Sequence, residues 1–440
     1  MKKVLVILEG FLLVTMLCMG TLAFAQSEDE AVGLYQKGNE SLQYGRYEEA
    51  LDYFEKSLKI NLQLNNLINI SVNLSSIGSV YKSLGRYDDA LKYYEESLKI
   101  GRQLNVPQLI AITLSSIGSV YYSLDQYEKA LSCFEESLKI NRELNIPKHI
   151  ATNLNNIGEV YRSLGQYDKA LSYFDESLKI YRELKIPQNI ATSLNNIGSV
   201  YSSLGQYERA LSYYEESLKI NRELNIPQDI AKNLNNSGFV YSSLGRYDEA
   251  IKYYTESLEI NKKLNTPQEI ATSLNNIGEV YRSLGQYEKA LNYHEESLKI
   301  KRQLNIPQSI ATSLNNIGLV YDSLGQYEKA LSYYDESLKI RRELKIPQDI
   351  ATSFNNIGAV YNSLGQYEKA LTYYEETLKI DRKLNIPQDI AMSLNNIGYI
   401  YKSLGQYDKA LSYHEEALKI RRKLKIPQDI TMSLENIGLV

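Results

Sequence analysis

A 40-residue period governs this chain. Compared with itself at that spacing, the sequence aligns from Gly38 to Gly438 without an insertion or a deletion. All nine prolines fall at one phase of the period, and a glycine and an alanine each recur at a phase of their own. Periods of about 20–50 residues are typical of repeat proteins, in which each unit stacks on its neighbours. The sequence therefore predicts a solenoid and not a set of separate globular domains.

Each repeat contains two segments with apolar residues at helical spacing. Residues 187–226 are an example, with the two apolar stripes Ile190, Leu194, Ile197 and Tyr201, then Tyr207, Ala210, Tyr214 and Leu218. Pro187 suits a first helical turn, where a missing N–H costs nothing. Gly205 and Asn225 suit the left-handed residue that ends a helix. We therefore expect two helices per repeat, with Gly198 and Ala210 at the point where they approach most closely.

The pattern Leu194, Ile197-Gly198, Tyr201, Ala210, Tyr214 resembles the tetratricopeptide repeat. It departs from that pattern in having Leu at the first aromatic position, Ser217 at a small position and a longer period. Long periods of this kind are similar to those of kinesin light chain arrays. The resemblance implies an all-α, right-handed superhelical solenoid of antiparallel helix pairs. It also implies a groove, lined by the first helix of each pair, that binds a protein or peptide.

The chain divides into three expected parts. Residues 1–25 have a Lys2-Lys3 start, an apolar run and an Ala23-Phe24-Ala25 end, which predict a secretory signal peptide and a secreted or periplasmic protein. The alternative is an uncleaved membrane anchor. Residues 26–425 make ten helical hairpins, and residues 426–440 make an unpaired first helix, which suggests that the chain is truncated.

An Asn-Asn pair recurs on the first helices, on the stripe that the resemblance places in the groove. Carboxamides both donate and accept, so a ladder of them matches the backbone of an extended peptide. The alternative is that these pairs bond between adjacent helices and serve stacking. Ser75-Ser76 and Ser115-Ser116 replace the pair in two early copies. The predicted groove residues are Asn155, Asn156, Asn195, Asn196, Asn235, Asn236, Asn275, Asn276, Asn315, Asn316, Asn355, Asn356, Asn395 and Asn396.

Selectivity would come from two neighbouring phases that differ between copies, which we call the variable stations. Some copies carry a Glu with an Arg, and others carry an apolar side chain. Such stations could read the side chains of a bound segment, although the same variation is expected of exposed sites that drift freely. The predicted specificity residues are Glu159, Arg162, Phe239, Glu279, Arg282, Leu319, Asp322, Tyr399 and Lys402.

Catalytic, metal and cofactor sites are not predicted, and we expect no enzyme activity. His294 and His414 replace Tyr at one phase, three repeats apart, and are expected to be packed, while His149 is expected to be solvated. Cys133 also replaces Tyr and is expected to be a small apolar substitute. The balance of 49 Lys and Arg against 53 Asp and Glu gives no field that attracts nucleic acid.

Two alternatives to a binding scaffold remain open. The array could be the regulatory arm of a larger effector enzyme, because it resembles the tetratricopeptide arrays that precede caspase-like protease modules. It could instead be a structural protein that associates end to end through the last helix, whose Ile437 and Leu439 would otherwise be left bare.

Overall fold

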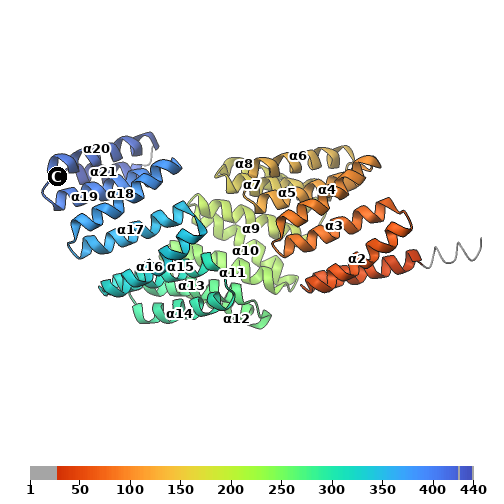
Figure 1. The fold of residues 1–440 in the computed structure, drawn as a ribbon, viewed down its shortest axis with the longest axis horizontal. Helices are drawn as coiled ribbons and strands as arrows, with labels where there is room; N and C mark the ends of the chain where they lie inside the picture. The colour runs from red at the N-terminus through yellow and green to blue at the C-terminus, as the bar shows by residue number, and fades with distance from the viewer. Residues whose placement is uncertain (1–26, 425–426, 439–440) are drawn as a thin grey trace, which may run out of the picture. The chain divides into compact units, whose positions relative to one another are not determined.

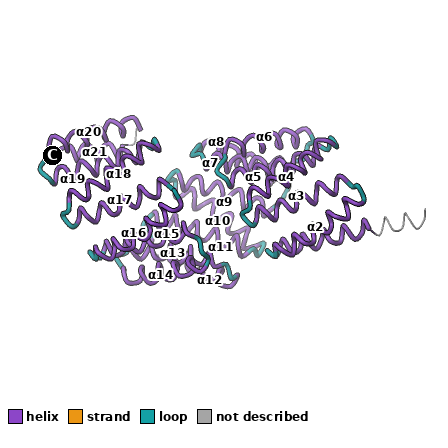
Figure 2. The backbone as a smooth tube through the Cα atoms, in the orientation of Figure 1, coloured by secondary structure: helices purple, strands orange, loops and turns teal. Residues whose placement is uncertain are grey.

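The computed structural model describes residues 27–424 and 427–438, so the predicted signal peptide lies outside the described residues. Helices and short loops make up this part of the chain, and Figure 2 shows no strand in it. The first helices of the pairs are residues 27–43, α3 (Leu67–Ser83), α5 (Pro107–Ser123), α7 (Pro147–Ser163), α9 (Pro187–Ser203), α11 (Pro227–Ser243), α13 (Pro267–Ser283), α15 (Pro307–Ser323), α17 (Pro347–Ser363) and α19 (Pro387–Ser403). The second helices are α2 (Tyr47–Gln63), α4 (Tyr87–Gln103), α6 (Tyr127–Glu143), α8 (Tyr167–Glu183), α10 (Tyr207–Glu223), α12 (Tyr247–Leu264), α14 (Tyr287–Gln303), α16 (Tyr327–Leu344), α18 (Tyr367–Leu384) and α20 (Tyr407–Leu424), and α21 (Pro427–Gly438) follows them.

The predicted helix ends are confirmed. α9 begins at Pro187, and Gly205 after it has φ +70°. The N–H of Gln206 then donates to the carbonyl of Tyr201 at 2.9 Å, which closes the end of the helix. Asn225 has φ 52° at the other loop of the same repeat. Where the copies lack Gly or Asn, other residues adopt the same left-handed conformation: Asp125, Lys185 and Lys345.

The close approach within a pair is also confirmed. A Cβ built on Gly198 would lie 2.8 Å from the ring of Tyr214 and 3.3 Å from the carbonyl oxygen of Ala210. Tyr214 and Ala210 are both buried. The missing side chain at Gly198 therefore lets the aromatic ring of the second helix lie directly on the backbone of the first.

Neighbouring pairs share one core. Phe134 of α6 packs with Leu154 and Ile157 of α7 in a single buried cluster. Within a pair, a hydroxyl bond also joins the two helices, since Ser137 of α6 donates to the carbonyl of Ala111 on α5 at 2.7 Å. The same bond recurs at other pairs, for example from Ser177 to Ala151 at 2.8 Å. Each pair therefore buries its apolar surface against the next one, as in other solenoids.

The chain forms two compact units, Met1–Ile220 and Asn221–Val440. Within each unit the helix pairs follow one another in chain order, as the colours of Figure 1 show. Each unit is an all-α, right-handed superhelical solenoid of antiparallel helix pairs. In the part of the chain described, no helix is long and apolar enough to cross a membrane.

Candidate functional site

The Asn pairs form a ladder of side-chain hydrogen bonds along the first helices. In each rung the Nδ2 of one Asn donates to the Oδ1 of an Asn on the preceding first helix, 41 residues earlier. Unit 1 has the rung Asn196 to Asn155 at 3.2 Å. Unit 2 has the rungs Asn276 to Asn235 (2.9 Å), Asn316 to Asn275 (3.0 Å), Asn356 to Asn315 (2.8 Å), Asn396 to Asn355 (2.9 Å) and Asn436 to Asn395 (2.7 Å). We call this set the Asn ladder.

The rungs join adjacent helices, which is the stacking role that the sequence left open. They do not use the full capacity of the carboxamides. A carboxamide has two N–H donors and two acceptor lone pairs, and a rung takes one donor from one Asn and one lone pair from the other. Asn195, Asn196 and Asn315 are buried, and the other predicted groove residues are half-buried. Peptide binding by the ladder stays a prediction.

Two variable stations are ion pairs on one helix turn. Arg162 contacts Glu159 at 2.7 Å in unit 1, and Arg282 contacts Glu279 at 2.9 Å in unit 2. Nε2 of His294 lies 3.4 Å from Oε1 of Glu279. Burial alone would raise the pKa of Glu279, but His294 and the positive charge of Arg282 outweigh it and lower that pKa. The second pair thus stays ionised and half-buried on the first helix.

The apolar stations differ in exposure. Phe239 is 54% exposed and Tyr399 is 53% exposed, both in unit 2. Leu319 packs against the core cluster of Tyr334 and Phe354 instead. Phe239 and Tyr399 can therefore contact a partner, whereas Leu319 contributes to stability as well. At the remaining stations Asp322 and Lys402 are half-buried, and burial raises the pKa of Asp322.

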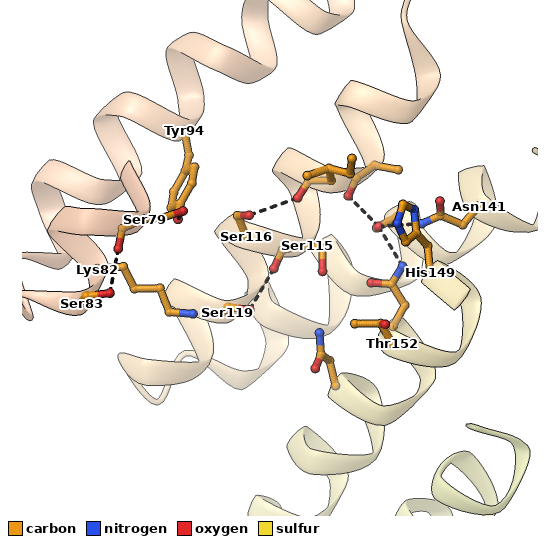
Figure 3. Close-up of a pocket in the computed structure, with 15 residues that line it drawn as sticks. Ser79, Lys82, Ser83, Tyr94, Ser115, Ser116, Ser119, Asn141, His149 and Thr152 are labelled. Atoms are coloured by element: carbon orange, nitrogen blue, oxygen red, sulfur yellow. Dashed lines mark hydrogen bonds between the residues drawn. The ribbon is translucent and has the colours of Figure 1, made fainter. Parts of the chain in front are cut away.

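A cavity of about 500 Å³ lies over α3, α5 and α7 in unit 1 (Figure 3). It lies where the Asn pair is replaced by serine, since Ser115 and Ser116 are on its wall. Lys82 of α3 and His149 of α7 also line it, on opposite sides of these serines in Figure 3. His149 is half-buried, so the expectation of a solvated side chain is wrong. We call this the serine cavity.

Comparison with known proteins identifies the family of the repeats that carry these sites. The family model described as "Tetratricopeptide repeat" matches residues 41–103, 109–183, 149–223, 189–263, 229–303, 269–343 and 349–423, well over half of the chain. The chain belongs to the tetratricopeptide repeat family. Tetratricopeptide arrays are in general non-catalytic interaction scaffolds, and this chain is a scaffold for protein interactions. No curated protein matches its sequence.

Solved tetratricopeptide structures share the fold at low sequence identity. The apo form of the quorum sensor NprR from B. thuringiensis is 16% identical, with a TM-score of 0.58, and the match covers 82% of this chain and 99% of that one. A Rap protein complexed with competence and sporulation factor is 17% identical, with a TM-score of 0.57, covering 81% and 99%. A signal transduction ATPase with a tetratricopeptide repeat sensor, from Pyrococcus horikoshii, is 16% identical, with a TM-score of 0.56, covering 87% and 55%.

Sequence reasoning missed a row of buried charges in the tetratricopeptide array. Lys301, Arg341, Asp381 and Arg421 lie at one phase of consecutive second helices, and all four are buried. Nζ of Lys301 donates to Ser313 at 2.8 Å, and burial lowers the pKa of Lys301 to about 8. The sequence does show this change, because most earlier copies have a neutral residue such as Asn141 or Asn261 at this phase, where these four copies have a charged one.

The other reactive groups of the array are packed. His294 and His414 are buried beneath Gly278 and Gly398, as the sequence predicted. Cys133 is half-buried, and burial raises the pKa of its thiol to about 11, which keeps it in the unreactive protonated form. Among the described residues, no group of three or more His, Cys, Asp or Glu side chains is placed to hold a metal ion.

Proposed function

We propose that this chain binds an extended protein segment along the Asn ladder and selects it through the variable stations, without chemistry of its own. The observation that carries the proposal is the series of five consecutive rungs in unit 2, from Asn235 to Asn436. Each rung fixes two carboxamides before any ligand arrives, so less rotamer freedom is lost on binding. The unused donors and acceptors then match the N–H and C=O groups of a peptide backbone.

The energy of a single hydrogen bond determines how many repeats the bound segment must contact. A net hydrogen bond contributes about 0.5–1.5 kcal/mol, and a micromolar complex needs about 8 kcal/mol. Several repeats must therefore act together with side-chain contacts. Phe239 and Tyr399 supply these contacts in the proposal, because exposed aromatic side chains are frequent anchors at interfaces. The Rap protein of similar fold, which was solved with competence and sporulation factor, is an analogy in support.

The test starts from dodecapeptides selected on the full chain from a random display library. The tightest peptide is then titrated against the double variant Asn275→Ser/Asn276→Ser, which copies the serines of the early repeats. We expect at least a tenfold loss of affinity, because two positions of the ladder no longer contact the backbone. Phe239→Ala should weaken the same peptide, while Arg302→Gln, at an ion pair between second helices, should leave its affinity unchanged.

The melting temperature separates the two roles of the ladder. A serine variant that melts at a much lower temperature but binds as before would mean that the rungs serve stacking alone. A variant that binds weakly and melts close to the parent supports the groove.

The proposal places this binding in the periplasm or outside the cell, because residues 1–25 have the pattern of a secretory signal. Mass spectrometry of the protein from a secreting bacterial host tests it. A mature chain that begins at Gln26 is expected, and an intact chain retained in the cytoplasm would contradict the assignment.

A further inference from the structure

The serine cavity lies where a rung of the Asn ladder is missing. By the spacing of the other rungs, Asn156 of α7 would donate to residue 115 of α5, but that residue is Ser115, and no rung joins them in the described structure. Serine is shorter than asparagine, so the space between the two first helices stays open. Ser115, Ser116, Ser119 and Asn156 all line the resulting cavity.

One end of the cavity carries a cation. Lys82 of α3 is half-buried there, and burial lowers its pKa. No Asp or Glu is among the residues that line the cavity, and no ion pair to Lys82 is found in the described part of the chain. A carboxylate that entered the cavity would therefore meet an unpaired positive charge in a partly desolvated place, where the attraction is stronger than in water.

The other end carries acceptors without donors. Asn141 and Asn153 are each only 2% exposed, and both donate through Nδ2 to Oγ of Ser137, at 3.4 and 2.9 Å. Oδ1 of each is buried with no hydrogen-bond partner. A buried acceptor in this state is unfavourable, because it has lost its hydrogen bonds to water without gaining others. The equivalent pair Asn61 and Asn73 leaves one such acceptor instead of two, because Nδ2 of Asn61 donates to Oδ1 of Asn73 at 3.0 Å while Oδ1 of Asn61 has no partner.

The serines add to this acceptor character. The hydroxyl of Ser116 donates to the carbonyl of Ile112 at 3.2 Å, and that of Ser119 donates to the carbonyl of Ser115 at 3.0 Å. Their protons are thus used, and their lone pairs remain for a ligand. In Figure 3 the side chain of His149 lies beside Asn141 at this end, and Nδ1 of His149 is buried without a partner.

We propose that the serine cavity binds a short free peptide by its two ends, with the carboxylate at Lys82 and the terminal ammonium at the carboxamide oxygens of Asn141 and Asn153. The ammonium brings the donors that these oxygens lack, and the carboxylate pairs with the lysine. The proposal does not depend on the Asn ladder, because the ladder is interrupted where this ligand binds.

The dimensions select the length of the peptide. Packed helices lie about 8–10 Å apart, so α3 and α7, which are separated by α5, are about 16–20 Å apart. Roughly half of that distance is taken by the side chains of Lys82 and Asn153. The remaining span of about 10 Å accommodates about three residues at 3.3–3.6 Å each. The volume of about 500 Å³ is also in the usual range of small-ligand sites.

The experiment uses the full chain and an equimolar library of tripeptides with both termini free, at millimolar total concentration. Peptides that the protein retains are identified by mass spectrometry, and the best one is titrated by calorimetry. The same tripeptide with an acetylated amino terminus, or with an amidated carboxyl terminus, should bind at least tenfold more weakly. Retention of no tripeptide, or equal binding of free and blocked forms, would overturn the proposal.

Two variants test the proposed site: one removes the cation that would bind the peptide carboxylate, and the other fills the cavity. Lys82→Met should weaken the free peptide at least tenfold and abolish the difference between the acid and the amide. Ser115→Asn should restore a rung to Asn156 and fill the cavity, so we expect loss of binding with a melting temperature equal to or above that of the parent. Lys99→Met, at an exposed lysine of α4 in the same unit that does not line the cavity, is the matched control and should bind normally.

The outcomes also separate this site from the proposed groove. Asn275→Ser/Asn276→Ser should leave tripeptide binding unchanged, whereas Ser115→Asn should not weaken the dodecapeptide that was selected on the full chain. Unchanged tripeptide binding by Ser115→Asn would place the peptide elsewhere and refute the serine cavity as its site.

Discussion

Two glycines of one helix test whether the helices of a pair approach closely, because replacing each by Ala should change stability differently. Gly33 and Gly38 both lie in the helix of residues 27–43. Apart from the backbone of its own helix turn and its chain neighbours, a Cβ on Gly33 would meet no atom within 4 Å, whereas a Cβ on Gly38 would lie 2.6 and 2.7 Å from Cε1 and Cδ1 of Phe54. Phe54 is fully buried, so its ring has little room to move.

The expected free energies follow from two terms. Replacing Gly by Ala inside a helix stabilises it by about 0.8–1.0 kcal/mol. Gly33→Ala should therefore raise the free energy of unfolding by about 1 kcal/mol. Gly38→Ala has the same gain, but overpacking against Phe54 costs about 1–3 kcal/mol. The net effect at Gly38 ranges from neutral to a loss of about 2 kcal/mol, and the two variants should differ by about 1–3 kcal/mol.

The assay has to report on the first helix pair, because repeat arrays open locally. Amide hydrogen exchange of residues 27–43 and of α2, together with urea denaturation of the whole chain, meets this need. Phe54→Leu in the Gly38→Ala background should recover part of the loss, since the smaller side chain vacates the space that Cβ requires. If Gly38→Ala stabilises the pair as much as Gly33→Ala does, the close-approach argument is refuted.

Four further substitutions test other features. Lys345 has φ 55° where most other copies have Asn, so Lys345→Asn should raise the free energy of unfolding by about 1 kcal/mol in urea denaturation. Burial, assisted by nearby positive charges, lowers the pKa of His414. The contribution of His414 to stability is therefore full above pH about 6.5 and is lost as the pH falls through the lower folded-state pKa. His414→Tyr should reduce the dependence of the melting temperature on pH between pH 7 and pH 5. Because burial lowers the pKa of Lys301 to about 8, Lys301→Asn should stabilise the chain at pH 7 by on the order of 1–3 kcal/mol, and calorimetry should show this difference shrinking as the pH rises above 8. The exposed ion pair of Arg302 with Glu336, 2.7 Å long, should contribute less than about 1 kcal/mol, so a larger loss in Arg302→Gln by urea denaturation would contradict the assignment.

The regular part of this fold was predictable because its determinants are local. Pro187, Gly205 and Asn225 act through backbone conformation, so their roles follow from residue type and position alone. The approach of Gly198 to Tyr214 followed as well, because the spacing of the two stripes leaves one small residue opposite one large one. The signal peptide remains a prediction from its sequence pattern.

The side-chain partners were harder to predict. An Asn on a first helix can bond to a ligand or to the next helix, and residue type does not decide between them, since the outcome depends on the 41-residue offset between neighbouring helices. The serine cavity had a visible signal at Ser115 and Ser116. The sequence held no signal for the unpartnered Oδ1 atoms of Asn141 and Asn153, because their state depends on how each side-chain amide turns toward Ser137.

The spacing of the contacts between helix pairs determines whether the chain still folds after it loses or gains a repeat. The bonds between helix pairs join residues 34 or 41 positions apart, as in Arg182 with Glu216 and Asn276 with Asn235. Loss or gain of a 40-residue segment brings an equivalent partner to each of these positions. Unequal recombination between nearly identical gene segments would therefore yield shorter or longer chains that still fold, each with a groove changed by one helix pair.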